Sequence, residues 1–138
     1  MIKILLVEDN FEHAKLMQLI LERKKVPAHI SVARDGIEAI NYLLRSTSAG
    51  TPVRNPRPDL ILLDLNTPRF DGRKVLHRLK SSKSLKDIPV VVVSTSEKPD
   101  DRAFAAREGA MEYICKSTGF EEWSEKLSRV YEFTPHVK

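Results

Sequence analysis

The sequence contains one cysteine, Cys115, among its 138 residues. A single cysteine cannot form an internal disulfide, so the chain fits a reducing compartment rather than the class of disulfide-stabilised secreted domains. No apolar run approaches the roughly 20 residues that span a bilayer. The apolar start of the chain meets two acids instead of a signal-peptide cleavage site. We therefore expect a cytoplasmic protein that does not enter a membrane.

Aromatic residues are also scarce, at 7% of the chain, and they are not interleaved with basic residues. The formal net charge is +4, but lysine and arginine are spread along the chain. Because nucleic-acid-binding domains combine a basic patch with a recognisable motif, we expect no DNA binding. The four histidines lack the spacing of metal ligands and predict no histidine metal site.

Five short apolar runs alternate with amphipathic stretches, and there is no internal repeat. The runs are too short for core helices, and several are rich in β-branched residues, so they predict buried parallel strands. The predicted strands are Ile2–Val7, His29–Val32, Leu60–Leu63, Val90–Val93 and Tyr113–Cys115.

A helical pattern follows each predicted strand. The first helix is expected after Asn10, a typical N-cap residue, and the last pattern runs from Phe120 to Tyr131. Gly72 is expected to supply turn geometry before the third helix. Five β-α units in succession indicate a single α/β domain with a parallel sheet covered by helices on both faces. Segment 46–58, rich in serine, proline and glycine, is expected to be an exposed loop within this domain.

Charged and hydroxyl residues follow the predicted strands at their carboxyl ends. In an open parallel sheet these ends meet at one edge, where ligands bind. We therefore expect the side chains at these positions to line one crevice. The residues are Glu8, Asp9, Asp64, Ser94, Thr95 and Lys116.

Three carboxylates in one crevice would repel one another. Two like charges 4 Å apart cost about 4 kcal/mol at an effective dielectric constant of about 20. A raised pKa on one acid or a bound cation relieves this repulsion. Mg²⁺ prefers oxygen ligands and completes its shell with water and phosphate oxygens, so we favour a magnesium site. The alternative is that the acids are separate surface groups that never meet.

A carboxylate beside a metal ion and a lysine can also act as a nucleophile toward phosphorus and form an aspartyl phosphate. Such a transfer needs positioning and neutralisation of the phosphoryl oxygens. Mg²⁺ and Lys116 could supply the charge, and Ser94 could donate a hydrogen bond. Asp64 is the best candidate nucleophile because it ends the central apolar run, Leu60–Leu63, between the other groups.

The segments that carry these residues resemble the receiver domain of two-component response regulators over about residues 2 to 133. The matching segments are ILLVEDN with the acidic pair, LILLDLNTPRFDG with the acceptor, IPVVVVSTS with the switch hydroxyl and GAMEYICK with the lysine. The resemblance implies a flavodoxin-like (βα)5 fold, a doubly wound sheet of five parallel strands in the order 2-1-3-4-5. It also implies a bacterial phosphorelay in which a histidine kinase or a phosphotransfer protein phosphorylates Asp64.

The resemblance further implies roles for the other residues of the crevice. The groups that would hold Mg²⁺ are Glu8, Asp9, Asp64 and the backbone carbonyl of Asn66. The groups that would bind the phosphoryl group or act as the switch are Ser94, Thr95, Tyr113 and Lys116. In this scheme Tyr113 turns inward on phosphorylation. The face formed by the last two helices and strands is then remodelled for a downstream protein target or for a second copy in a homodimer.

Two positions depart from the family pattern. Glu8 replaces the commoner aspartate, and Ser117 stands where many receivers have a proline after a cis peptide bond. Because a cis bond before a non-proline residue costs about 2.5–4 kcal/mol, we expect a trans bond here. The 46–58 loop, the phosphoacceptor block and the Lys116-Ser117 pair are similar to the single-domain regulators that partner bacterial and cyanobacterial phytochromes. This narrower resemblance implies phytochrome signalling.

We therefore expect a stand-alone receiver over residues 1–138, without an output domain and with at most weak autophosphorylation or autodephosphorylation activity, rather than an enzyme. One alternative is a phosphatase or phosphotransferase of the haloacid dehalogenase type. Against it, Asn66 stands where such enzymes have a second, proton-donating aspartate. The other alternative is a degenerate receiver that acts only as a binding module. The complete set of crevice residues argues against that.

Overall fold

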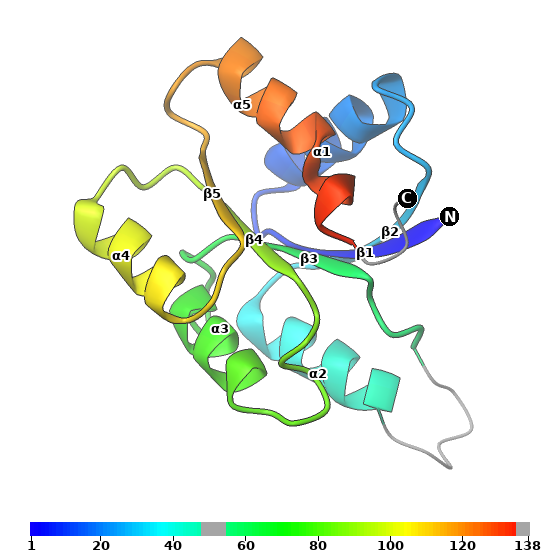
Figure 1. The fold of residues 1–138 in the computed structure, drawn as a ribbon, viewed down its shortest axis with the longest axis vertical. Coiled ribbons are helices and arrows are strands. Elements are labelled where there is room, and N and C mark those ends of the chain that lie inside the picture. Colours follow the sequence, from blue (N-terminus) through cyan, green and yellow to red (C-terminus); the bar gives the residue numbers. More distant parts are fainter. Residues whose placement is uncertain (48–54, 135–138) are drawn as a thin grey trace.

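The computed structural model describes residues 1–47 and 55–134 of the chain (Figure 1). Its centre is one five-stranded parallel sheet with the order β2-β1-β3-β4-β5. The strands are β1 (Ile2–Val7), β2 (Ala28–Ala33), β3 (Leu60–Leu63), β4 (Val90–Ser94) and β5 (Glu112–Cys115). The five predicted strands and the 2-1-3-4-5 order are therefore confirmed.

Helices cover both faces of the sheet. They are α1 (Phe11–Arg23), α2 (Gly36–Thr47), α3 (Gly72–Lys80), α4 (Pro99–Arg107) and α5 (Phe120–Ser128), followed by the short 3₁₀ helix η1 (Val130–Phe133). Helices α1 and α5 lie on one side of the sheet, and α2, α3 and α4 lie on the other (Figure 1). Within residues 1–47 and 55–134, none of the helices has the length and apolar character that a membrane span requires.

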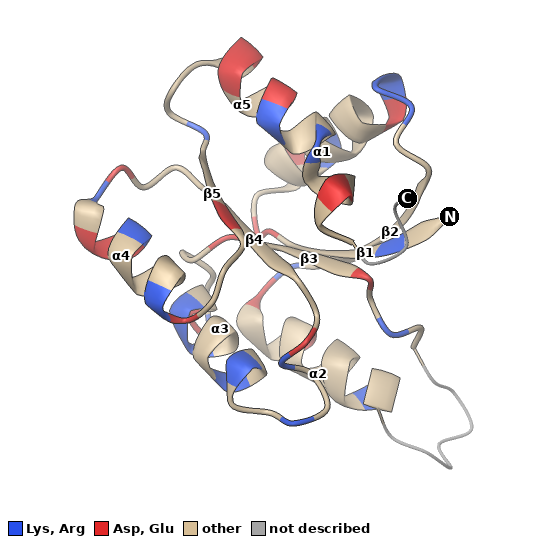
Figure 2. Cartoon of the chain, in the orientation of Figure 1, with Lys and Arg blue, Asp and Glu red and all other residues tan. Residues whose placement is uncertain are grey.

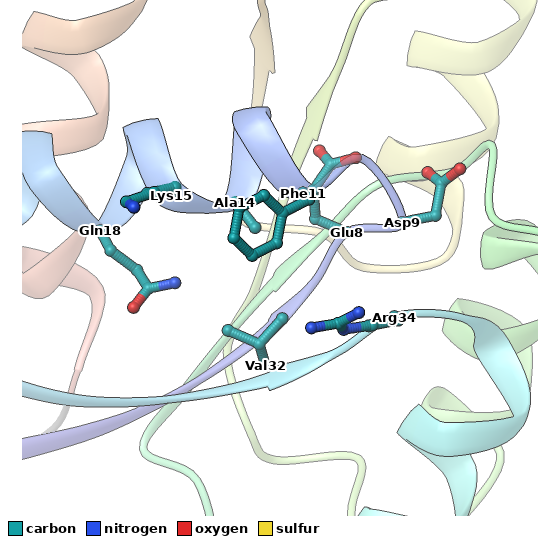
Figure 3. Close-up of a pocket in the computed structure, with 8 residues that line it drawn as sticks. All are labelled: Glu8, Asp9, Phe11, Ala14, Lys15, Gln18, Val32 and Arg34. Atoms are coloured by element: carbon teal, nitrogen blue, oxygen red, sulfur yellow. The ribbon is translucent and has the colours of Figure 1, made fainter.

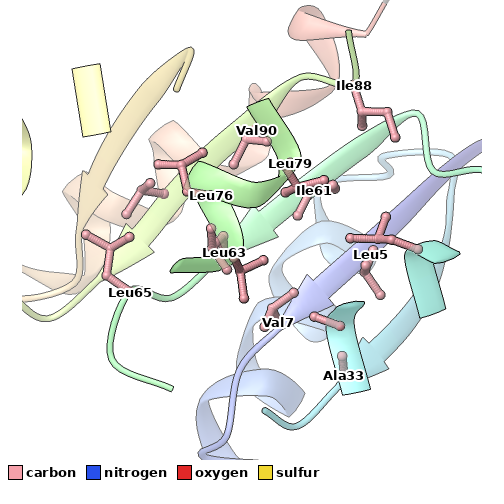
Figure 4. Packing of buried hydrophobic residues seen from close by; sticks show 14 of the residues in the cluster. Leu5, Val7, Ala33, Ile61, Leu63, Leu65, Leu76, Leu79, Ile88 and Val90 are labelled. Carbon is pink, nitrogen blue, oxygen red and sulfur yellow. The ribbon is translucent and has the colours of Figure 1, made fainter. Parts of the chain in front are cut away.

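The central strand, β3, is buried on both faces. Its successive side chains point to opposite sides of the sheet, and helices cover both sides. Leu60 and Leu62 belong to the core under α1 and α5, whereas Ile61 and Leu63 belong to the core under α2 and α3. All four side chains are fully buried, and complete burial of such a side chain stabilises the fold by about 1.5–3 kcal/mol. Figure 4 shows the second of these cores, with Leu65 continuing it beyond the strand.

The strand register brings the predicted functional residues to the same edge of the sheet. Val7 pairs with Leu63 in the neighbouring strand, and Ser94 pairs with Cys115. The residues that follow these pairs therefore leave the sheet together. The tertiary fold thus produces the shared edge that the strand pattern predicts.

Two sequence-based boundaries were wrong. The last helix ends at Ser128, and Val130 and Tyr131 lie in the 3₁₀ helix rather than on the continuous helical face that we expected. Segment 46–58 is only partly an exposed loop, because Ser46 is a buried residue of α2 and Pro58 is buried beside β3. The hydroxyl of Ser46 donates to the carbonyl of Leu43, which satisfies a buried polar side chain in the last turn of α2. Residues 48–54 lie outside the described residues.

Lysine and arginine are distributed over helices and loops rather than gathered on one element (Figure 2). This distribution agrees with the observation that lysine and arginine are spread along the sequence.

Candidate functional site

Three carboxylates meet at the edge of the sheet where β1 and β3 end. Glu8, Asp9 and Asp64 each offer an oxygen atom, and these three atoms lie within 4.8 Å of one another. Glu8 is buried, at 2% exposure, Asp64 is 8% exposed, and Asp9 is exposed to solvent. The three acids therefore meet at one edge of the sheet, as predicted, and the alternative that they never meet was wrong.

Asp64 is held by the backbone on both sides of it. Its amide donates to the carbonyl of Val7 at 3.0 Å, which extends the pairing of β1 with β3 by one residue. Its Oδ1 atom accepts a hydrogen bond from the amide of Asn66 at 3.0 Å. The carboxylate therefore sits just beyond a fully buried strand, with one oxygen fixed by the loop that follows.

Lys116 contacts Glu8 from the end of β5. Its Nζ atom donates to Glu8 Oε1 at 2.6 Å, and both side chains are almost completely buried. The amide of Asn10 donates to the other oxygen, Oε2, at 3.1 Å. Burial raises the pKa of Glu8, while the hydrogen bond and the charge of Lys116 act in the opposite direction. In this structure the ammonium group of Lys116 therefore contacts Glu8. A contact between Lys116 and a phosphoryl group stays a prediction.

His13 is a member of this site that sequence reasoning missed. It lies in the first turn of α1, and its Nδ1 atom is 3.0 Å from Lys116 Nζ. Burial, followed by the charge of Lys116, lowers the pKa of His13, so a neutral ring can accept the lysine's hydrogen bond. The spacing between the four histidines gives no sign of this contact. The available signal was that the first turn of a helix after a strand end faces the ligand-binding edge.

The two hydroxyl residues after β4 differ in their surroundings. Ser94 is completely buried, and its Oγ atom accepts from the amide of Ser96 at 3.2 Å. Thr95 is exposed, and its backbone carbonyl accepts from the hydroxyl of Ser117 at 2.8 Å. Ser94 is therefore the one of the pair that the fold holds in place by its side chain.

Tyr113 points inward in this structure. The residue is 7% exposed, and its hydroxyl donates to the carbonyl of Ser96 at 2.9 Å. The guanidinium group of Arg102 lies over its ring, 4.7 Å from the centroid. Burial raises the pKa of the phenol, so the hydroxyl keeps its proton and acts as a donor at neutral pH. Tyr113 thus links β5 to the loop that follows β4.

The loop after Lys116 contains the serine that departs from the family pattern. The described residues contain no cis peptide bond, as expected for this sequence. The amide of Lys116 donates to the carbonyl of Ser94, and the Ser117 hydroxyl fixes the loop to Thr95. Ser117 therefore takes part in holding the lysine's loop against the end of β4.

The loop between Asp64 and α3 is anchored to the neighbouring β2–α2 connection. Arg69 has a left-handed backbone, with φ of 64°, and its Nε atom lies 2.7 Å from Asp35 Oδ2. This guanidinium group lowers the pKa of the Asp35 carboxyl. At Gly36, any side chain would collide with the carbonyl of Phe70. The loop that carries Asn66 thus packs closely against the β2–α2 connection.

A cavity of about 360 Å³ opens between α1 and β2, and it shares Glu8 and Asp9 with the carboxylate crevice (Figure 3). Phe11, which lines this cavity, is 63% exposed. Lys15 and Arg34 each place a cationic group 5.8 Å from the centroid of the Phe11 ring. The carboxylate cluster therefore adjoins a partly apolar depression.

The donor set of the crevice fits a divalent metal ion. All three converging groups are carboxylates, and hard cations such as Mg²⁺ and Mn²⁺ prefer oxygen ligands. Asn66 follows Asp64 closely enough for its backbone carbonyl to be a further candidate ligand. A bound cation would supply the positive charge that offsets the repulsion between the acids.

Comparison with known proteins agrees with this geometry. Residues 4–128 match the response regulator receiver domain family. The chain is 36% identical over 130 residues to response regulator Rcp1 of Synechocystis sp., across 94% of this chain and 86% of that protein. A solved structure of the Mn²⁺-bound form of Rcp1 superposes with a TM-score of 0.85 at 34% identity, covering 100% of this chain and 98% of the other.

A second similar structure is that of the phosphorylated cyanobacterial phytochrome response regulator RcpA. It superposes with a TM-score of 0.81 at 41% identity and covers 96% of this chain and 93% of that one. The similarity therefore extends over nearly the whole length of both chains.

Proposed function

Because the chain belongs to the response regulator receiver domain family, we propose that it is a phosphorylation switch whose phosphoacceptor is Asp64. The observation that carries this proposal is the convergence of Asp64 with Glu8 and Asp9 at the end of a buried strand, beside the Lys116–Glu8 ion pair. A histidine kinase or a phosphotransfer protein would be the donor.

In the proposed transfer, a carboxylate oxygen of Asp64 attacks the phosphorus atom of a phosphohistidine. The new P–O bond forms as the P–N bond breaks, and the histidine leaves with the electron pair of that bond. Glu8, Asp9, Asp64 and the Asn66 carbonyl would hold Mg²⁺, which neutralises phosphoryl charge when bound. Lys116 would exchange its contact with Glu8 for one with a phosphoryl oxygen, and the Ser94 hydroxyl would donate a hydrogen bond.

Phosphorylation adds about 1.5 to 2 negative charges and favours the packing that can satisfy them. We propose that Ser94 and Tyr113 carry this change to the face formed by α4, β5 and α5. Thr95, which is exposed beside Ser94, would border the phosphoryl site. A downstream protein target, rather than DNA, would bind this face, and a second copy of the chain could bind there as well.

We further propose that the chain accepts a phosphoryl group without turning over small substrates, so that it is not a phosphatase. A hydrolase of the haloacid dehalogenase type needs a proton donor two residues after the nucleophile. Here Asn66 has that position, and its Oδ1 atom accepts a hydrogen bond from Arg73 instead.

Similarity to a phytochrome response regulator supports a phytochrome-type histidine kinase as the donor. Such a kinase would phosphorylate the chain in the cytoplasm. Its phosphorylated form should transfer to this protein faster than a phosphorylated kinase from an unrelated pathway does. Equal rates from the two kinases would contradict this assignment without affecting the role of Asp64.

The central test is phosphorylation of purified protein by acetyl phosphate in the presence of Mg²⁺. Intact-mass spectrometry should show the mass of one added phosphoryl group, and Asp64→Asn should abolish it because the amide is not a nucleophile. Asp59→Asn, at the residue directly before the same strand, is the matched control and should still be labelled. An unmodified wild-type protein, or equal labelling of Asp64→Asn, would overturn the proposal.

A further inference from the structure

The side chain of Arg73 connects the loop after Asp64 to helix α4. Arg73 lies in the first turn of α3, and its Nη1 atom donates to the carbonyl of Leu65 and to Asn66 Oδ1, each at 3.3 Å. Its Nε and Nη2 atoms donate to Asp101 Oδ1 at 3.1 and 2.7 Å. Asp71, the N-cap of α3, also contacts Nη1 at 3.2 Å. One guanidinium group therefore contacts both ends of the loop between β3 and α3 as well as helix α4.

The connection continues from Asp101 to both switch positions. The second oxygen of Asp101 accepts a hydrogen bond from the hydroxyl of Ser96. The carbonyl of Ser96 accepts from the hydroxyl of Tyr113, and its amide donates to Ser94 Oγ. An unbroken series of hydrogen bonds therefore runs from the loop after the phosphoacceptor to Tyr113.

The Arg73–Asp101 contact differs from an ordinary surface ion pair. The side chain of Asp101 is 9% exposed and that of Arg73 is 31% exposed, whereas the Arg129–Glu125 pair on α5 is 68% and 51% exposed. Exposed pairs contribute little to stability, while charge-assisted bonds to a buried carboxylate are stronger and geometrically more specific. The Ser96 hydroxyl, and then Arg73, lower the pKa of Asp101, so this carboxylate is ionised at neutral pH.

A purely local role does not account for the contacts of Arg73. Asp101 already lies in the first turn of α4, where the helix dipole favours a negative charge. A partner needed only for that charge would not also bind the carbonyl of Leu65 and the amide oxygen of Asn66. These two contacts act on the segment that provides the expected backbone ligand of the metal ion.

We propose that Arg73 is a positioning residue for the Asp64 site, which fixes the Leu65–Asn66 segment and, through Asp101 and Ser96, joins it to Tyr113. The inference rests on the proposed function and deepens it. Because the loop and α4 share the same guanidinium group, a movement of the loop alters the hydrogen bonds that hold Ser96. The environment of Tyr113 then changes with the occupancy of the crevice.

The test compares Arg73→Gln, Asp101→Asn and the double variant with wild-type protein, all unphosphorylated. Arg129→Gln, which breaks the exposed pair on α5, is the matched control. Two quantities are measured for each protein: the Kd for Mg²⁺ by calorimetric titration, and the change in the NMR signals of the Tyr113 ring when Mg²⁺ binds. Urea unfolding separately reports stability.

We expect each single substitution to weaken Mg²⁺ binding about tenfold. This is the smaller effect that is typical when a protein loses a group that orients its metal ligands. The Kd of the double variant for Mg²⁺ should not exceed that of the single variant that binds Mg²⁺ more weakly, because both substitutions break the same connection. The Mg²⁺-induced change at Tyr113 should be lost in all three and retained in Arg129→Gln. A residue with a merely structural role would lower stability while leaving both readouts unchanged.

Wild-type Mg²⁺ affinity in folded Arg73→Gln and Asp101→Asn, or independent additive losses in the double variant, would overturn the proposal. If Arg73→Gln does not fold, Arg73→Lys replaces it, since lysine keeps the charge but cannot form the forked contact. Neither readout requires phosphoryl transfer. A wild-type protein that cannot be phosphorylated would therefore refute the proposed function and leave this test intact.

Discussion

At the scale of single residues, the Lys116–Glu8 pair shows how the site accommodates charge inside the fold. Taking an ion out of water costs several kcal/mol, and only close contact with a partner offsets this cost. Here the two charged atoms are 2.6 Å apart, and Asn10 satisfies the second oxygen of the carboxylate. Because Glu8 is also an expected metal ligand, Mg²⁺ and Lys116 compete for the same carboxylate.

This competition predicts the behaviour of Lys116→Met, which removes the ammonium group but keeps an unbranched side chain only one heavy atom shorter. Without Mg²⁺ the free energy of unfolding should fall by about 3–5 kcal/mol, because Glu8 is left buried without an opposite charge. Mg²⁺ should then stabilise the variant more than it stabilises wild-type protein, because the metal ion replaces the missing charge. Urea unfolding with and without Mg²⁺ measures both effects.

The same experiment has a pH dependence with a definite sign. Burial raises the pKa of Glu8 above its ordinary value of 4.5, so the folded state binds this proton more tightly than the unfolded state. The deficit of Lys116→Met should therefore shrink as the pH is lowered toward that value. Lys15→Met, at an exposed lysine near the crevice, is the control and should show little change. Equal stabilisation of Lys116→Met and wild-type protein by Mg²⁺ would contradict the competition.

At the scale of elements, the close approach of α3 to the end of β3 depends on Gly72. We expected this glycine to supply turn geometry, but its backbone is not among the positive-φ glycines of the described chain. Its function is instead the absence of a side chain, because a Cβ atom would collide with the carbonyl of Asp64 and with Leu65. The amide of Gly72 also donates to the Leu65 carbonyl at 3.0 Å.

Gly72→Ala should therefore disturb both stability and the site. We expect the free energy of unfolding to fall by about 1–3 kcal/mol, the usual cost of overpacking. Mg²⁺ binding should weaken as well, because the backbone of Asp64 must move to admit the methyl group. Urea unfolding and Mg²⁺ titration test this, with Lys74→Ala on the exposed side of the same helix as the control. Wild-type stability together with wild-type affinity in Gly72→Ala would show that the helix can shift without moving the site.

At the scale of the whole molecule, helix α4 is attached to the core by a small surface. Its buried residues are Asp101 and Ala105, whereas α1 and α3 each bury four residues. Elements with few buried contacts open and move most easily. The α4–β5–α5 face also exposes Ala103 and Met111, the latter at 53%. A weakly attached helix beside exposed apolar groups suits a surface that changes on phosphorylation.

If this face forms the proposed homodimer, Met111→Glu should prevent dimer formation by placing like charges at the interface. Analytical ultracentrifugation of protein loaded with Mg²⁺ and beryllofluoride, which mimics the phosphoryl group, measures the association. Leu19→Glu introduces the same charge at an exposed apolar position on α1 and should leave the dimer intact. A dimer that survives Met111→Glu, or that Leu19→Glu disrupts to the same extent, would place the interface elsewhere.

The sequence by itself determined the layered fold and the meeting of the three carboxylates. Short β-branched runs cannot form core helices, and alternation with helical patterns imposes a parallel sheet. Parallel strands then deliver the residues after Val7 and Leu63 to one edge, whatever the details of packing. Both inferences depend on hydrophobic periodicity and chain direction, which can be recognised from short stretches of the sequence.

Only the tertiary structure decided which partners these residues choose. Lys116 contacts Glu8 and His13, more than 100 residues away in the chain, and Arg73 bridges Leu65 and Asp101. These contacts depend on distances of a few ångströms between segments that are remote in sequence. The burial of each charged group then determines how strongly it needs an opposite charge nearby. The periodicity of the sequence predicts neither these distances nor the burial of the charged groups.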